Sequence, residues 1–77
     1  MKKTFKIGEY AVGGIIKVEY LKAKEIIVVE FLDYFTKEIV LSHSFNTNQL
    51  LEMEFFIEDN CTSFWADNIT NYVKSKL

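Results

Sequence analysis

Residues Ile15–Phe45 read IIKVEYLKAKEIIVVEFLDYFTKEIVLSHSF, and apolar residues recur there at alternate positions in three runs. A period of two is the pattern of a β-strand that buries one of its faces. Short polar segments separate the runs, and connections of this length join antiparallel neighbours. The stretch therefore predicts three consecutive strands of an antiparallel meander.

The predicted strands cover residues 15–21, 25–33 and 38–45, and a first strand at 4–12 precedes them. Gly13 and Gly14 are expected to form the turn of a tight hairpin, because glycine adopts the positive φ values that such turns require. The strand at 25–33 is apolar on both faces. We therefore place it in the centre of the sheet, with neighbouring elements covering both of its sides.

Residues 46–60 allow two interpretations. Apolar residues alternate there with acidic ones, which indicates a fifth strand; they are Leu51, Met53, Phe55 and Ile57. The segment from Gln49 to Phe56 contains no β-branched residue, and Asn46 and Gln49 have the spacing of a capping box, which favours a helix. We predict a short helix at 48–58 and keep the strand as the alternative.

The carboxy-terminal segment has the spacing of an amphipathic helix, with Thr62 or Ser63 as its N-cap. Its apolar stripe is Trp65, Ala66, Ile69, Tyr72, Val73 and Leu77. The predicted fold is α+β and forms a single domain, 1–77. A four-stranded antiparallel β-meander, or a five-stranded one if 50–58 is extended, packs against the C-terminal amphipathic helix, with the short second helix at 48–58.

The composition is that of a small domain with a large apolar fraction. Of the 77 residues, 49% are apolar and 16% aromatic, and the rings expected to supply core area are Phe5, Phe31, Phe55, Phe56 and Trp65. The lone Cys61 forms no internal disulfide and suits a reducing cytoplasm. We expect no targeting segment and no membrane span. Abundant lysine, without arginine or proline, is typical of AT-rich bacterial or phage genomes.

The residues that usually carry chemistry are scarce. His43 and Cys61 are the only histidine and cysteine. The chain therefore offers two zinc ligands of these types, fewer than the four of a structural zinc site. A Cys61–His43 nucleophile pair is the one enzymatic alternative, provided that the fold brings the two side chains together. We predict no catalytic residues, no metal ligands and no cofactor, and expect that the protein is not an enzyme.

Charge is distributed unevenly along the chain. All nine basic residues are lysines, and none lies in 38–73, a window that contains six acidic residues. Polyanion binding depends mainly on basic side chains that neutralise phosphates, so the pattern argues against nucleic acid. It favours a basic protein partner, which an acidic surface with aromatic anchors would attract.

We therefore predict a small non-enzymatic protein-interaction module of the inhibitor or adaptor type. Its partner is another protein or a second copy in a homodimer, and its expected partner-binding residues are Tyr34, Phe35, Glu52, Glu54, Glu58 and Asp59. The alternative is a small β-barrel-like domain for nucleic acid or a small ligand. In that alternative Tyr20, Tyr34 and Phe35 stack on a planar ring.

Overall fold

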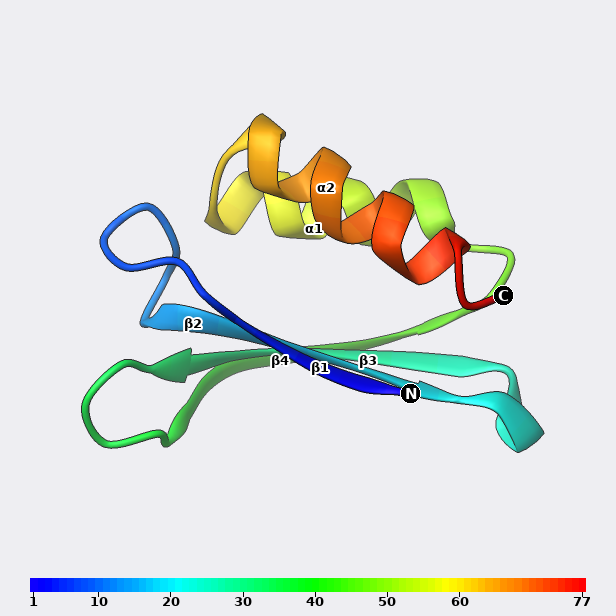
Figure 1. The fold of residues 1–77 in the computed structure, drawn as a ribbon, viewed down its shortest axis with the longest axis horizontal. Helices are drawn as coiled ribbons and strands as arrows, with labels where there is room; N and C mark the ends of the chain where they lie inside the picture. Colours follow the sequence, from blue (N-terminus) through cyan, green and yellow to red (C-terminus); the bar gives the residue numbers. More distant parts are fainter.

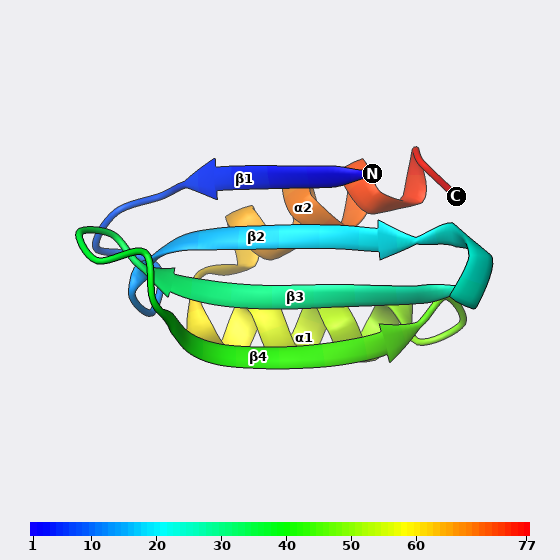
Figure 2. The same ribbon diagram turned by 90° about the horizontal axis from the view of Figure 1, so that it is seen from below.

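The computed structural model describes residues 1–77, which form one sheet and two helices. The elements are β1 (Lys2–Lys6), β2 (Gly14–Leu21), the 3₁₀ turn η1 (Lys22–Lys24), β3 (Ile26–Asp33), β4 (Ile39–Asn46), α1 (Leu50–Asn60) and α2 (Ser63–Lys74). The antiparallel sheet has the order β1-β2-β3-β4. Both helices cover the same face, with α2 behind β1 and β2 and α1 behind β3 and β4 (Figure 1 and Figure 2). The predicted α+β meander and the helical interpretation of 48–58 are confirmed.

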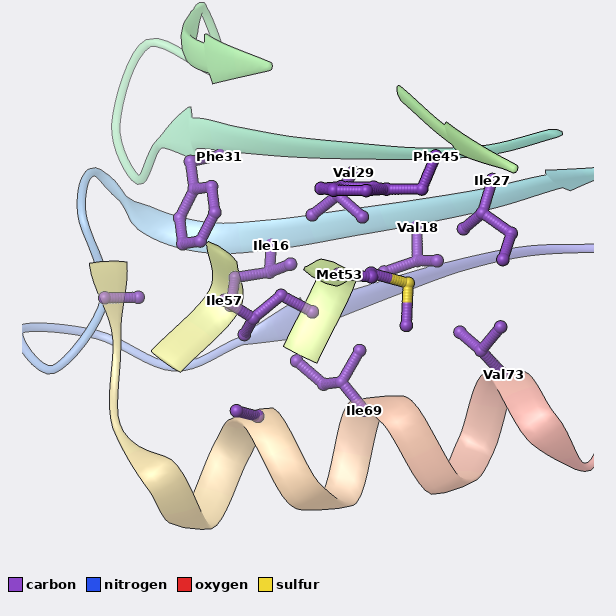
Figure 3. Packing of buried hydrophobic residues seen from close by; sticks show 12 residues of the cluster. Ile16, Val18, Ile27, Val29, Phe31, Phe45, Met53, Ile57, Ile69 and Val73 are labelled. Atoms are coloured by element: carbon purple, nitrogen blue, oxygen red, sulfur yellow. The ribbon is translucent and has the colours of Figure 1, made fainter. Parts of the chain in front are cut away.

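The core lies between the sheet and the two helices. Alternate side chains of β2 and β3 point toward the helices, and the register places Ile16 beside Phe31 and Val18 beside Val29. Figure 3 shows how α1 contributes to the same layer. The helical members of the core are Met53 and Ile57 of α1 and Ala66, Ile69 and Val73 of α2.

Aromatic rings join the outer strands to the helices. The Phe5 ring of β1 lies 6.4 Å from that of Trp65 and 5.8 Å from that of Tyr72, both on α2. At the opposite edge of the sheet, on the same face, the Phe56 ring of α1 lies 5.6 Å from that of Phe45 of β4. Each edge strand is thus held to its own helix by edge-to-face or tilted ring contacts, which suit the aromatic quadrupole.

The connection between β1 and β2 differs from the predicted two-residue hairpin. β1 ends at Lys6, a loop follows, and Gly14 already belongs to β2. The N–H groups of Ile7 and Gly8 both donate to the Gly14 carbonyl, at 2.9 Å each. Gly13 is needed for another reason: a Cβ there would lie 2.5 Å from the Leu32 carbonyl oxygen, so a neighbouring backbone excludes any side chain.

The central position predicted for the most apolar strand is confirmed, because β3 lies between β2 and β4. The helices occupy only one side of the sheet, so just one face of β3 is covered by helices (Figure 1). On the open face, Val28 and Leu32 are half-buried among neighbouring strands. An ion pair between Lys17 and Glu30, with Nζ and Oε1 3.3 Å apart, makes that face partly polar.

The helix starts follow local hydrogen bonds. The Thr62 hydroxyl accepts from the Trp65 N–H at 3.2 Å, which confirms Thr62 as the N-cap of α2. At α1 only half of the predicted capping box forms. The Asn46 N–H donates to Gln49 Oε1 at 2.8 Å, while the helix itself begins at Leu50.

We expect Gly13→Ala to lower the free energy of unfolding by about 3 kcal/mol or more, and Gly8→Ala by only about 1–2 kcal/mol. Both glycines have positive φ, 76° and 89°, so both alanines share the left-handed backbone strain. Only the Gly13 position adds a backbone clash, because nothing lies within 4 Å of a Cβ at Gly8. Equal losses for the two variants in urea unfolding would contradict this account.

We expect Thr70→Val to raise the free energy of unfolding by about 1 kcal/mol. Thr70 is 2% exposed, and its hydroxyl has no hydrogen-bond partner, so the nearly isosteric valine removes an unsatisfied buried group. The control is Thr70→Ser, which keeps the hydroxyl, removes the buried methyl group and should destabilise. Thermal unfolding of both variants measures the difference, and a less stable valine variant would refute the explanation.

Candidate functional site

The outward side of α1 carries an apolar pair surrounded by carboxylates. Leu51 and Phe55 are 61% and 54% exposed and lie one helical turn apart. Residues three or four positions apart are neighbours on a helix surface, so Phe55 adjoins acidic side chains before and after it. We call this surface the acidic helix face, and its exposed residues are Leu51, Glu52, Phe55, Glu58 and Asp59.

The expectation that Phe55 supplies core area is wrong. Met53 and Ile57 are fully buried, and a helix turns by about 100° per residue, so Phe55 points away from both of them. On a strand all three side chains would have shared one face. Phe56, by contrast, is half-buried, and its ring lies 5.7 Å from that of Phe31 in the core.

The carboxylates of α1 have no cationic partner within the molecule. Lys17–Glu30 in the sheet is the only ion pair, so Glu52, Glu54, Glu58 and Asp59 are all unpaired. Three of them are exposed, whereas Glu54 is half-buried. The last turn of α1, where the helix dipole is negative, contains no basic residue. The whole helix therefore presents uncompensated negative charge to its surroundings.

The turn between β3 and β4 holds Tyr34 and Phe35 in a defined conformation. Asp33 Oδ1 accepts from the N–H groups of Phe35 and Thr36, at 2.9 Å each. These two hydrogen bonds lower the pKa of the Asp33 carboxyl, because they favour its charged form. Lys37 donates to the Tyr34 carbonyl and lies 5.0 Å from the Tyr34 ring centroid. Phe35 is 87% exposed at the tip.

This turn borders an open hollow of about 590 Å³ beside the β1–β2 loop. The lining residues are Lys6, Ile7, Gly8, Glu9, Ala11, Gly13, Gly14, Tyr34 and Phe35. The turn bends away from the helices, toward the open side of the sheet (Figure 1). The structure therefore does not join Tyr34 and Phe35 with the α1 carboxylates into one surface.

The three rings of the alternative hypothesis do not gather either. Tyr20 is next to the end of β2 and pairs with Ile27, whereas Gly14 at the start of β2 pairs with Asp33, next to Tyr34. The length of the strand thus separates Tyr20 from the turn. The sheet is open, with β1 and β4 as its edges, so no barrel-like cavity forms.

His43 and Cys61 have separate environments. The His43 ring stacks on that of Phe45, with centroids 4.5 Å apart, and meets the edge of Phe56 at 5.5 Å. Cys61 lies in the link between the helices and is half-buried, and this burial raises the pKa of its thiol. The Cys61 N–H donates to the Glu58 carbonyl at 3.4 Å. No three histidine, cysteine, aspartate or glutamate side chains converge in a way that suits a metal ion.

No protein-family model matches this chain, and no curated protein or solved structure matches it. Neither helix has the length and apolar character needed to cross a membrane.

The lowered pKa of Asp33 makes the turn sensitive to acid. The turn hydrogen bonds stabilise the fold above the ordinary aspartate pKa of 3.8 and are lost as the pH falls through the lower folded-state value. We expect the Phe35 and Thr36 amide resonances to titrate with a midpoint below 3.8. In Asp33→Asn this titration should disappear. A midpoint at or above the ordinary aspartate value would exclude the hydrogen-bonded carboxylate.

Proposed function

We propose that this protein is a non-enzymatic interaction module of the inhibitor or adaptor type, and that it binds a basic protein through the acidic helix face. The observation that carries the proposal is the exposed Phe55 ring among carboxylates, in a stretch of sequence without lysine. Aromatic side chains at the centre of an interface supply much of its binding energy. Surrounding charges steer the encounter and select partners of opposite sign.

The placement of charge on α1 supports a role in binding rather than in stability. Glu58 and Asp59 lie at the negative end of the helix dipole, where each carboxylate costs about 0.3–1 kcal/mol. Glu54 and Glu58 are four residues apart, a spacing at which like charges repel. Residues that weaken the fold while remaining exposed are typical of functional surfaces, where stability is exchanged for activity.

The Tyr34–Phe35 turn provides a second, separate contact surface. It lies on the other side of the sheet from α1 (Figure 1), and the Asp33 hydrogen bonds hold its backbone. Two surfaces on opposite sides would let one small domain bridge two proteins, which favours the adaptor form of the proposal. The separated environments of His43 and Cys61 support a non-enzymatic role. The cytoplasm, the compartment we propose, suits the unpaired Cys61 thiol.

The test combines charge reversal with site-specific cross-linking in the cells that produce the protein. In one variant, a photoreactive phenylalanine analogue replaces Phe55. In a second variant of the same chain, the analogue replaces Asn71, which is exposed on α2. We expect a defined protein adduct from position 55 and none from position 71. Glu58→Lys combined with Asp59→Lys should reduce the adduct about tenfold or more, because the basic partner loses its counter-charges.

Stability distinguishes this result from unfolding. The same double variant replaces two unfavourable carboxylates with lysines that complement the helix dipole, so its free energy of unfolding should rise by about 1 kcal/mol. The matched control is Glu9→Lys combined with Asp67→Lys, which changes the net charge equally at exposed positions away from the acidic helix face. An adduct that survives the first pair, or that disappears equally with the second, would rule out the acidic helix face as the binding site.

A further inference from the structure

The hydrogen-bonding phase of β4 shows which of its backbone groups face outward. The Thr47 N–H donates to the Glu25 carbonyl at 3.1 Å, in line with the register that pairs Ile26 with Asn46. Because an antiparallel ladder alternates, Leu41, His43 and Phe45 bond to β3, up to the register shift that separates them from Ile39. The N–H and C=O groups of Ser42, Ser44 and Asn46 therefore point away from the sheet.

One end of this outer edge is already occupied, and the middle is not. The Asn46 N–H donates to the Gln49 side chain at 2.8 Å, and the Asn46 carbonyl accepts from the Gln49 N–H at 2.9 Å. Ser42 and Ser44 have no comparable hydrogen bonds to a neighbouring loop, and both residues are exposed. Their outward groups form a free template for another strand.

The two edges of the sheet are protected very differently. β1 has five residues and includes Lys2, Lys3 and Lys6, and lysine is a common means of blocking strand addition. β4 has eight residues, with no charged side chain and no proline, and its one register shift lies near its start, before Ser42 and Ser44. It also exposes Ile39 and Val40 at its start. An exposed sheet edge without charged side chains leaves its backbone groups open to an added strand.

We propose that β4 binds an extended segment of the partner as a fifth strand, and that this segment carries lysine or arginine on alternate residues. The inference rests on the proposed function and specifies how the basic partner is held. Main-chain hydrogen bonds to Ser42 and Ser44 provide the attachment, and α1 provides the charge selection.

The position of α1 places carboxylates beside the new strand. Phe56 contacts His43 on β4, and Glu52 and Asp59 are its neighbours on the helix surface, four residues before it and three after. α1 lies along β4 at the border of the sheet (Figure 2). A strand about 4.8 Å beyond β4 has alternate side chains on the helix side, so a lysine there extends toward these two carboxylates.

Charge also argues against a second copy as the occupant. Pairing β4 with β4 of another copy would bring two α1 helices together, each with four unpaired carboxylates and no lysine. Adding β1 of one copy to β4 of the next would neutralise the charges, but a head-to-tail contact builds a ring of several copies or an open filament, not a closed dimer. A basic strand from another protein pairs with the outward backbone groups of β4 and also neutralises the carboxylates of α1.

The test uses a peptide of about eight alternating lysine and valine residues, a common strand length, and the folded full chain. At saturation, amide hydrogen exchange of Ser42 and Ser44 should slow by about tenfold or more. A glutamate–valine peptide should give no protection, because its carboxylates face those of α1. A lysine–valine peptide with central prolines should also fail, because it lacks the N–H groups that the edge requires.

Ser44→Pro tests the edge within the protein. Proline removes an outward N–H and leaves the β3–β4 ladder intact, which is where edge strands tolerate proline. The matched control is Thr4→Pro on β1. The bonded Met1–Tyr20 pair fixes the phase of that strand, so the Thr4 N–H also points outward. We expect Ser44→Pro to abolish peptide protection of Ser42, and Thr4→Pro to preserve it.

The outcomes separate this inference from the proposed function. If the Phe55 adduct is lost on charge reversal at Glu58 and Asp59 but persists in Ser44→Pro, the interaction module stands and strand addition is refuted. Equal protection by the lysine and glutamate peptides would also overturn the inference. So would sedimentation showing that the protein alone self-associates in a way that Ser44→Pro prevents, because the occupant would then be a second copy.

Discussion

Burial of one face of the β2–β3 pair beneath two helices is the constraint on which the remaining structure depends. Side chains alternate along a strand, so a shift of register by one residue would exchange Ile16 and Val18 for Ile15 and Lys17 in the core. A single register is therefore strongly specified. Both helices must then cover the same side, and they reach the outer strands through the Phe5 and Phe56 rings. What this arrangement leaves uncovered is the open face, the two edges and the outer side of α1.

The meander was predictable because its signal is local. The strands expected at 15–21, 25–33 and 38–45 agree with β2, β3 and β4 to within a residue or so at each end. The β1–β2 loop was not predictable, because Gly13 is required by the Leu32 backbone, a contact distant in sequence. Phe55 was misplaced for a similar reason. Phe55 alternates with Met53 and Ile57 in the sequence as it would on a strand. In the helix, however, its side chain points toward solvent while the other two are buried.

The candidate site was only partly visible in the sequence. The absence of lysine from 38–73 indicated the acidic region, and Tyr34 and Phe35 were predicted as partner-binding residues. Their separation by the sheet is a property of topology, and composition carries no information about it. Leu51 was missed because exposure of a helical residue depends on which face packs. A low-amphipathicity helix such as α1, with apolar residues all around, gives no such indication.

Two liabilities of this fold lie side by side. The carboxylates of α1 repel one another and oppose the helix dipole, and the adjacent β4 edge leaves the backbone groups of Ser42 and Ser44 unpaired in the plane of the sheet. The opposite edge of the sheet has neither an uncharged strand nor an excess of carboxylates. There β1 carries lysines, and the Lys3 ammonium lies 5.9 Å from the Tyr72 ring of α2. Either liability alone is common on protein surfaces. A basic strand relieves both at once, whereas an acidic strand or a basic helix relieves only one. In the complex that we propose, selectivity arises from the adjacency of the edge and the carboxylates. A competitor that pairs with the edge alone leaves the carboxylates without a counter-charge, and one that neutralises the carboxylates alone leaves the edge unpaired.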